Sequence, residues 1–540
     1  MAKEKKTTQF TKKKYYTDEY LGTGVQWGSF IISGGFLLLF VILAFFIPDN
    51  MSSWVNNSFD FSAKYFGLYW QLLVFATFIV GLILMFSRYG RVKLGLVDSP
   101  LYSNFRWVAM ILTTLLAAGG VFWAAGEPMA HFLNTPPLFA DGELTEWDKA
   151  IIGLSQSFLH WGFNAWAILG TTATIVLMYA HYHKGMPLKP RTILYPIFGD
   201  KLFKRNHVVG ILADVTSAVA VAAGTVGAIG FLGLQASYAA EQIFGLPNTL
   251  ATQITFIVIL IAIATVSAIT GVDKGIQILS RFNVGFAVLL MIVILIIGPT
   301  MFIFDAFVSA EAFQISNYLM MSLTRGDPAW LAGWTVFFWG WFIGYAPMMA
   351  IFITRISRGR TIRELILAVG ILAPIVSNIW FTVLGGTGIF FETKNPGIIS
   401  EPLNNSGQEA AVMAILEQMP FTSILAFSFL IITIIFVATT TDSMAYASAV
   451  SVTGNDNPKT SVRVFWALIF GATAVALLAM GQSNVGMFQN FIVASAVPVS
   501  FLMLPPVWDS VKIAKELAVE QGIKGKKEYS FEEDDNYPHV

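Results

Sequence analysis

The sequence predicts an all-α membrane protein that crosses the bilayer twelve times, and three observations lead to this prediction. Of the residues, 55% are hydrophobic and only 12% are charged, whereas soluble domains carry about 25% charged residues. Apolar segments of roughly 20 residues, the length that one span requires, recur along nearly the whole chain. The basic residues gather in every second connection between these segments.

In chain order, each predicted span is an apolar segment of about the length that crosses the hydrocarbon core. The spans cover residues 25–48, 66–87, 105–124, 151–180, 208–236, 250–270, 283–304, 331–353, 365–390, 421–450, 463–481 and 487–507. Residues 306–328 are amphipathic and too polar to span, so we expect a helix on the outer surface there. Residues 1–24 and 508–540 are then two tails flanking one transmembrane domain at 25–507.

The distribution of positive charge predicts the orientation. If the N-terminal tail is cytoplasmic, every Lys and Arg of the 33 present lies on the cytoplasmic side except Lys64, Lys149, Arg325 and Lys394. Cytoplasmic connections of membrane proteins carry such an excess of basic residues. We therefore expect a multi-pass protein of the inner (plasma) membrane with both termini cytoplasmic.

The composition also argues against several classes of protein. The chain has no Cys, which excludes disulfides and thiolate metal sites. We find no convergent set of nucleophile, acid and base in the sequence, so we expect no enzyme and no cofactor. His181 and His183 have no further ligand nearby, and we expect no metal other than sodium. Nothing indicates a channel selectivity ring or a nucleic-acid partner.

Small residues interrupt two of the spans at corresponding places. One interruption is residues 117–120 (AAGG) in the third span, and the other is residues 340–347 in the eighth. Paired interruptions five spans apart are typical of inverted repeats that form a transporter site between them. Spans 3–7 and 8–12 would be the two repeats. Close packing between helices is the alternative reason for small residues in spans.

The eighth span is unusually aromatic. Seven of the fourteen residues in 334–347 (WTVFFWGWFIGYAP) are Trp, Phe or Tyr. Phe338, Trp341, Phe342 and Tyr345 fall on one helix face. Aromatic faces buried in a membrane suit a cation without N–H donors, such as a quaternary ammonium. Ordinary packing against lipid or neighbouring helices is the alternative.

Several short sequences resemble those of the betaine/choline/carnitine transporter family. The most specific is residues 356–364 (ISRGRTIRE), which follows the aromatic span. The others are residues 88–91 (RYGR), 127–128 (EP), 160–161 (HW), 274–277 (KGIQ), 385–387 (GGT) and 441–443 (TDS). The resemblance covers about residues 25–505 and implies twelve spans, two five-span inverted repeats, a sodium-symporter-like core and a homotrimer.

The resemblance also implies a substrate site. Trp341, Phe342 and Tyr345 match an aromatic box, and two Trp of the fourth span match further family positions. The substrate-binding residues that we expect are Trp161, Trp166, Phe338, Trp341, Phe342 and Tyr345. A third aromatic position of the fourth span is Leu169 here. This departure argues against a four-sided cage and leaves a sulfonium or a smaller amine open as the head group.

The tenth span contains a run of hydroxyls at residues 436–443 (FVATTTDS). Hydroxyl and carbonyl oxygens are the ligands that hard cations take. The resemblance implies that Thr439 and Thr440 ligate sodium together with third-span carbonyls, and that Thr225 belongs to a second site. The expected ion-binding residues are Thr113, Leu116, Phe436, Thr439, Thr440 and Thr225. Alternatively, the Thr hydroxyls bond carbonyls of their own helix.

Two departures from the family pattern bear on the ion. Val221 replaces the partner of Thr225, and only Gly119 remains of three family glycines in the third span. Sodium-independent exchange and proton coupling therefore stay open.

Charged residues at or within the spans are candidates for function. We expect Asp442 to be a structural or gating group near the ion site and Asp214 to lie at the cytoplasmic interface. Glu127 precedes Pro128 and is expected to organise a turn. The Arg residues of 355–363 would combine orientation with a cytoplasmic gate, and contact with anionic lipid is the alternative.

Three hypotheses follow. The first is a secondary active carrier that imports a quaternary-ammonium compound resembling glycine betaine, by sodium symport with alternating access. The second is a sodium-independent exchanger or proton-coupled carrier of carnitine, choline or a sulfonium. The third, which nothing in the residues favours, is a channel or a membrane enzyme. The expected partners are the small-molecule substrate, membrane lipids and further copies of the chain in a homotrimer.

Overall fold

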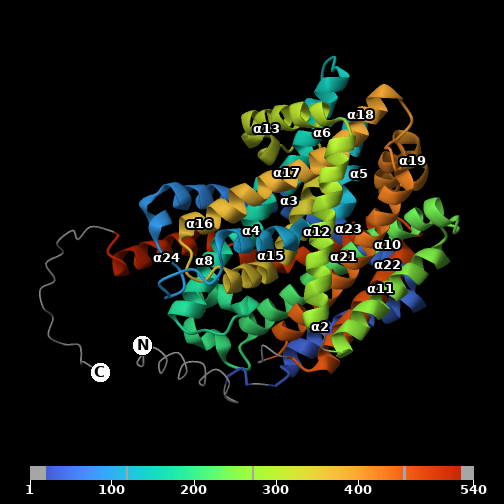
Figure 1. The fold of residues 1–540 in the computed structure, drawn as a ribbon. Coiled ribbons are helices and arrows are strands. Elements are labelled where there is room, and N and C mark those ends of the chain that lie inside the picture. Colours follow the sequence, from blue (N-terminus) through green and yellow to red (C-terminus); the bar gives the residue numbers. More distant parts are fainter. Residues whose placement is uncertain (1–19, 23, 117–118, 271–272, 454–457, 524–540) are drawn as a thin grey trace, which may run out of the picture.

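The computed structural model describes residues 20–22, 24–116, 119–270, 273–453 and 458–523, and the side chains of 113–116 and 273–281 lie outside this description. Within these ranges the chain is helical, and the two β-bridges, Val25 with Thr453 and Lys93 with Thr361, are isolated. Figure 1 shows long helices packed around one another. The predicted all-α, polytopic fold class is thus confirmed.

The α-helices of the first half of the chain are α2 (Trp27–Phe46), α3 (Pro48–Phe86), α4 (Asn104–Leu116), α5 (Gly119–Leu133), α6 (Glu146–Trp161), α7 (Phe163–Gly170), α8 (Thr172–Met178), α9 (Tyr195–Phe198), α10 (Val208–Phe244) and α11 (Leu250–Thr270). Those of the second half are α12 (Asp273–Ile297), α13 (Thr300–Leu323), α14 (Pro328–Leu331), α15 (Phe337–Ile356), α16 (Ile362–Leu367), α17 (Ala373–Phe381), α18 (Thr387–Lys394), α19 (Ser400–Ser406), α20 (Ala411–Glu417), α21 (Thr422–Ser451), α22 (Thr460–Met480), α23 (Gly486–Met503) and α24 (Pro506–Glu520).

Tighter or wider helical turns connect several of these helices. The 3₁₀ turns are η1 (Arg88–Arg91), η2 (Pro137–Phe139), η4 (Pro190–Leu194), η5 (Gly199–Phe203) and η9 (Gln408–Ala410). The π turns are η3 (Tyr179–His183), η6 (Ala332–Val336), η7 (Ala368–Leu372) and η8 (Thr382–Gly386). The π turns lie within otherwise continuous helical runs, where they often occur at functional sites.

Ten helices or helical runs in the described ranges are long and apolar enough to cross a membrane. An eleventh candidate is α12 with α13, which meet at a bend of 108°. Such a bend means that α13 does not continue the direction of α12. The predicted third span corresponds to α4 and α5, each shorter than a full span. The count of twelve and the two repeats remain predictions.

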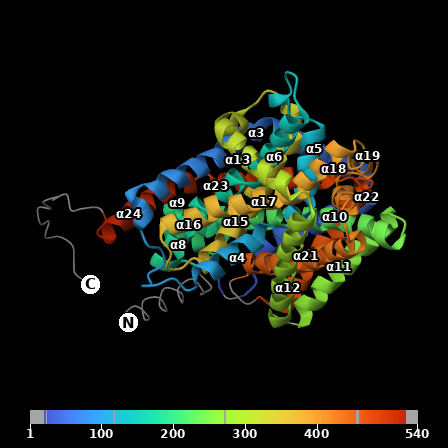
Figure 2. The same ribbon diagram turned by 45° about the horizontal axis from the view of Figure 1, so that its top comes forward.

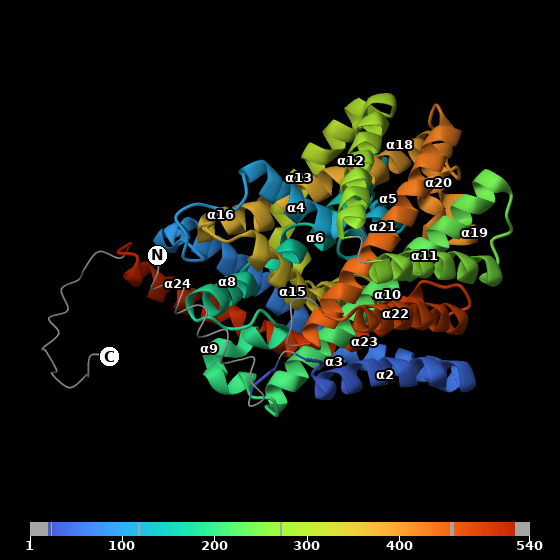
Figure 3. The same cartoon turned by 60° about the horizontal axis from the view of Figure 1, so that its bottom comes forward.

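Burial separates the central helices from those that face the membrane. In the most apolar 18-residue stretch of each helix or helical run, 94% of the residues are buried in Glu146–His183 and 89% in both α10 and Pro328–Ile356. The corresponding share is only 33% in α11 and 39% in α2. Figure 3 shows α2, α22 and α11 side by side, which agrees with their contacts. In the interior, α15 packs against α7, α10 and α23; Figure 2 shows α15 in the middle of the bundle. A site between the central helices is therefore shielded from lipid.

The predicted second span corresponds to the later part of a longer helix, α3, which begins at Pro48; proline is well accommodated in the first turn of a helix. One local expectation was wrong. The eighth span was predicted to be interrupted between residues 340 and 347, but α15 runs continuously through Pro347. The irregular turn is η6, directly before α15.

Candidate substrate and ion sites

Aromatic rings from four helices meet in the interior of the protein. We call Trp161, Phe231, Phe338, Trp341, Phe342 and Phe381 the aromatic cluster; all six side chains are buried. The ring centroid of Trp161 lies 5.5 Å from Phe338, 6.0 Å from Trp341 and 5.3 Å from Phe342, and each contact is edge-on. Phe231 of α10 meets Trp341 edge-on at 5.5 Å. The stripe of the eighth span therefore faces protein, not lipid.

Two glycines let these rings approach neighbouring backbones. A Cβ at Gly119 would lie 2.7 Å from carbon atoms of both Trp161 and Trp341. A Cβ at Gly224 would lie 2.1 Å from Tyr345 and 3.0 Å from Trp341. Both distances to the nearer ring are shorter than van der Waals contact, so only glycine fits these positions without moving the rings.

We expect Gly224→Ala to disturb the aromatic cluster. The added methyl group must push the Tyr345 ring aside, because it would lie only 2.1 Å from a carbon atom of that ring. Such overpacking strains the surrounding side chains. A radiolabelled betaine-binding assay should show affinity lowered by about tenfold or more, since overpacking typically costs about 1–3 kcal/mol. Gly285→Ala is the matched control, because no atom lies within 4 Å of its Cβ position on α12. Equal affinities for the two variants would contradict the prediction.

Tyr345 joins the aromatic face to α10 by a polar contact. Its hydroxyl lies 3.0 Å from the hydroxyl of Thr225, which also donates to the carbonyl of Val221 at 2.7 Å. Tyr345 is only half-buried, unlike Phe338, Trp341 and Phe342 of the same helix. Thr225, which the resemblance assigns to a second ion site, therefore contacts Tyr345, which the resemblance assigns to the substrate site.

The structure does not bring Trp166 to the aromatic cluster. Its indole N–H donates to the Ser377 hydroxyl at 2.9 Å, and its ring packs in a separate buried group with Ile353 and Val369. Trp166 follows Trp161 by five residues, and the chain turns between α6 and α7 at Gly162. This turn changes the direction in which the two indoles point.

The hydroxyl run of α21 is intact as a helix. The Thr439 hydroxyl donates to the carbonyls of Ile435 at 2.8 Å and Phe436 at 3.2 Å. Such a hydroxyl keeps its lone pairs and can still ligate a cation. Thr440 is half-buried, and the buried Thr441 hydroxyl has no hydrogen-bond partner within the described ranges. Oxygen donors that fit sodium are therefore present.

Thr113 and Leu116, also expected at the ion site, belong to the last turns of α4. Their side chains lie outside the described residues.

Asp442, which follows the Thr residues, pairs with Arg463 of α22 at 3.3 Å. This ion pair joins the end of the hydroxyl run to the neighbouring helix.

The structure reveals a buried acid–imidazole triad that sequence reasoning missed. Glu127 Oε1 lies 2.6 Å from His160 Nδ1 and 3.4 Å from His131 Nε2, and all three side chains are at most 1% exposed. Glu127 Oε2 accepts the indole N–H of Trp161 at 2.7 Å. The expectation that Glu127 organises a turn was wrong, because α5 continues through Pro128 to Leu133.

The sequence contained a partial signal for this triad. His131 follows Glu127 by four residues, so both lie on one face of α5. The short sequences that contain Glu127 and His160 both resemble family motifs. The spacing of residues along the chain does not, however, predict that side chains on two different helices will meet.

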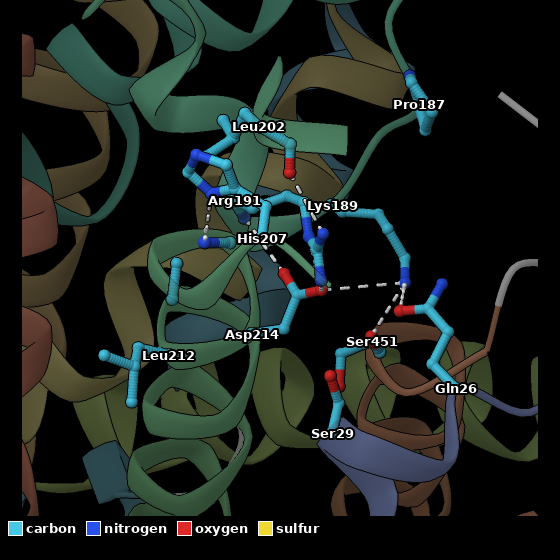
Figure 4. A network of polar contacts seen from close by, with 12 residues as sticks. Gln26, Ser29, Pro187, Lys189, Arg191, Leu202, His207, Leu212, Asp214 and Ser451 are labelled. Atoms are coloured by element: carbon cyan, nitrogen blue, oxygen red, sulfur yellow. Dashed lines mark hydrogen bonds and ion pairs between the residues drawn. The ribbon is translucent and has the colours of Figure 1, made fainter. Parts of the chain in front are cut away.

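A second buried ionic network lies at one end of α10 (Figure 4). Asp214 accepts Arg191 Nε and pairs with its NH2 group, both at 2.8 Å, and Lys189 Nζ lies 3.8 Å away. Lys189 also donates to Gln26 before α2 and to the Ser451 carbonyl at the end of α21. Asp214 is fully buried, so its carboxylate is paired inside the protein near the start of α10. This network ties three helix ends together.

The Arg residues after α15 hold a neighbouring connection in place. Arg358 donates to the Gly95 carbonyl at 2.8 Å, Arg360 to the Tyr102 carbonyl at 2.6 Å and Arg363 to the Met85 carbonyl at 2.9 Å. The guanidinium groups of Arg358 and Arg360 also lie over aromatic rings. These contacts bind the end of α3 and the segment between α3 and α4 to the residues that follow α15.

Comparison with known proteins gives a consistent result. A family model described as the betaine/carnitine/choline family transporter matches residues 29–519. The chain is 51% identical over 494 residues to glycine betaine transporter 2 of Vibrio parahaemolyticus, covering 92% of this chain and 91% of that one. It is 32% identical to the glycine betaine transporter OpuD of Bacillus subtilis, covering 85% and 88%. An ectoine/hydroxyectoine transporter of Virgibacillus pantothenticus is 30% identical, with 88% and 94% covered.

Proposed function

The chain belongs to the betaine/carnitine/choline transporter family, and from this premise we propose that it imports a glycine betaine-like quaternary ammonium compound by sodium symport. The observation that supports the substrate class is the aromatic cluster. It lies between central helices, and its six rings are buried. The carboxylate next to it, Glu127, accepts the indole N–H of Trp161 at 2.7 Å. A site of this kind selects a methylated cation over a hydrated one, because the rings attract charge but offer no hydrogen-bond acceptor to an N–H group.

The ring geometry suggests how the onium head is accommodated. In the edge-on contacts of Trp161 with Trp341 and Phe342, the electropositive edge of one ring faces the electronegative face of another. A trimethylammonium group can take the place of such an edge when the rings move apart. Each desolvated cation–π contact then contributes about 0.5–2 kcal/mol. The same motion would open the site to one side, as alternating access requires.

For sodium, we propose ligands from Thr439, Thr440 and the Phe436 carbonyl of α21, with Thr113 and Leu116 supplying carbonyls from α4. Helix ends and interrupted helices supply such carbonyls in transporters of this type. The boundary between α4 and α5 is close to these positions. Thr225, through its contact with Tyr345, would couple a second ion to the substrate site.

The cellular setting is part of the proposal. The protein would reside in the inner membrane with both termini cytoplasmic, as the distribution of basic residues favours. It would assemble as a homotrimer with lipid around it.

Uptake of labelled glycine betaine into proteoliposomes tests the proposal. We expect uptake to require an inward sodium gradient and to stop when potassium replaces sodium. If uptake is unchanged without sodium, the carrier works by exchange or proton coupling and not by sodium symport. A carrier that takes up no betaine, carnitine or choline under either condition would overturn the substrate class as well.

We also expect the double variant Thr439→Ala/Thr440→Ala to raise the sodium concentration for half-maximal uptake by about tenfold or more. Two oxygen ligands of sodium are lost, and a loss of about 1.4 kcal/mol in binding free energy already lowers affinity tenfold. Thr433→Ala is the control. Its hydroxyl is buried on the same helix and bonds the Phe429 carbonyl, as Thr439 bonds its own helix. An equal change in both variants would show that general weakening of α21 is responsible.

A further inference from the structure

The acid–imidazole triad of Glu127, His131 and His160 is a set of titratable groups that the proposed transport cycle does not yet use. All three side chains are buried within the helical bundle. Glu127 and His131 come from α5 and His160 from α6, and these two helices pack closely. Hydrogen-bond and ring contacts of the triad involve only uncharged groups in the described part of the chain: Gln156, Trp161, Trp330, Trp334, Thr335, Phe338 and Trp339.

The hydrogen bonds indicate the charge of the triad. His160 Nδ1 lies 2.6 Å from the Glu127 carboxylate, and His160 Nε2 lies 3.1 Å from the Gln156 amide nitrogen and 3.0 Å from the Thr335 hydroxyl. With Glu127 ionised, a neutral His160 that carries its hydrogen on Nδ1 satisfies these contacts, because Nδ1–H donates to the carboxylate and Nε2 accepts from the amide. If His131 were neutral too, the ionised Glu127 would leave one uncompensated negative charge inside the membrane. Such a charge is costly unless a cation accompanies it.

A proton fits as that cation better than a metal ion does. Ligand atoms around a tetrahedral metal, each about 2.0–2.1 Å from it, stand roughly 3.4 Å apart. Glu127 Oε1 and His160 Nδ1 are only 2.6 Å apart, which is a direct hydrogen bond. His131 Nε2 points at Glu127 Oε1 and has no hydrogen-bond partner in the described ranges. One added proton between these two atoms neutralises the triad.

The triad touches the aromatic cluster at two points. Glu127 Oε2 holds the indole N–H of Trp161 at 2.7 Å, and the ring of His160 stacks on Phe338 with centroids 4.9 Å apart. Trp161 therefore separates the carboxylate from the proposed onium position. At this short range, within a low-dielectric interior, a negative triad attracts an onium cation more strongly than a neutral triad does.

We propose that Glu127, His131 and His160 form a proton-binding site that is linked to the substrate: binding of the onium head favours release of the proton from the triad. The N–H or O–H bond of that proton breaks, its electron pair stays on the triad, and the proton passes to bulk water. The negative charge that remains faces the onium cation across Trp161. Glu127 acts here as a positioning residue as well, because it holds the Trp161 indole.

Linkage fixes the sign of the pH dependence. If the free protein holds more protons than the bound protein, affinity for betaine rises with pH, by at most about tenfold per pH unit for one proton. The other titratable or charged groups on elements packed against α5 or α6 include Arg106 on α4, Asp214, Tyr238 and Glu241 on α10, Asp305, Glu311 and Tyr318 on α13, Glu392 and Lys394 on α18, Glu409 on η9 and Glu417 on α20. Burial raises the pKa of Glu409, on η9, to about 7, so the experiment must separate Glu409 from the triad.

Titration calorimetry of the purified protein with glycine betaine, at constant sodium and in two buffers of different ionisation enthalpy, measures protons released per betaine bound. We expect roughly half to one proton released by the wild-type protein near neutral pH, and affinity that rises at least about threefold between pH 6 and pH 8. Glu127→Gln should still bind betaine, because the amide oxygen can accept the Trp161 N–H. Its proton release and its pH dependence should both be lost.

Two variants with the same chemical change serve as controls. Glu409→Gln and Glu311→Gln each remove a largely buried carboxyl group outside the triad; Glu311 contacts Asn378 instead. Both should keep the proton release of the wild-type protein. His131→Gln, which leaves Glu127 in place, should also lose the release, and a thermal melt shows whether each variant is folded.

This inference rests on the proposed function, which supplies the position of the onium head. The outcomes of the experiment nevertheless distinguish a failure of one from a failure of the other. Betaine binding without proton release, or release that disappears in Glu409→Gln but persists in Glu127→Gln, overturns the inference alone. Absence of betaine binding by the wild-type protein at every pH overturns the proposed function and the inference with it.

Discussion

Trp341→Leu is expected to abolish the thermal stabilisation of the purified protein by glycine betaine. Trp341 contacts Trp161, Phe231 and Phe342 within the aromatic cluster, so its loss removes one cation–π surface and opens the packing of three others. A desolvated contact of this kind is worth about 2 kcal/mol or more, which corresponds to at least about a 30-fold loss of affinity. Stabilisation by a ligand falls with its affinity.

The matched control for this experiment is Trp54→Leu. Trp54 lies on α3, is 43% exposed and is not a member of the aromatic cluster, so the same substitution there leaves the cluster untouched. We expect the control to keep the full shift with betaine. If Trp341→Leu also keeps it, the onium head binds elsewhere and the aromatic cluster is a packing core.

Asp214→Asn is expected to produce the largest loss of stability. The substitution removes the carboxylate that pairs at 2.8 Å with Arg191, a side chain that is 1% exposed. Removal of one partner from a buried ion pair costs about 3–5 kcal/mol, because the other charge stays buried and unpaired. Thermal unfolding in detergent at one fixed scan rate should show a Tm well below that of the wild-type protein.

The comparison for this prediction is an exposed pair of similar chemistry. Glu146 and Lys149 form an ion pair at 2.8 Å in which the side chains are 54% and 35% exposed. Glu146→Gln should lower stability by at most about 1 kcal/mol. Combining Asp214→Asn with Arg191→Met should recover part of the lost Tm, since the unpaired charge is then removed. Equal Tm values for Asp214→Asn and Glu146→Gln would contradict the expectation.

These two predictions concern different parts of the transporter. The aromatic cluster lies between the central helices and is the proposed site of substrate recognition. The network of Arg191, Lys189 and Asp214 lies at the helix ends, where it joins the start of α2, the end of α21 and the connection before α10 (Figure 4). Loss of the network should therefore affect stability more than affinity for betaine.

Sequence alone determined the features that depend on local composition. The apolar segments, the charge asymmetry and the aromatic face of the eighth span all follow from residues close together in the chain. The family resemblance rested on short contiguous sequences, and the family model confirms it. Helix ends were less predictable: α3 begins far ahead of the expected boundary, because the preceding segment continues the same helix from Pro48.

Only the tertiary structure decided which side chains meet. Glu127 and His160 are 33 positions apart, and Thr225 and Tyr345 are 120 apart, yet each pair is within hydrogen-bond distance. Conversely, Trp166 was grouped with Trp161 but packs beside Ser377. The physical reason is that periodicity states which face of a helix a residue occupies, whereas the rotation and tilt of that helix are set by packing against all its neighbours.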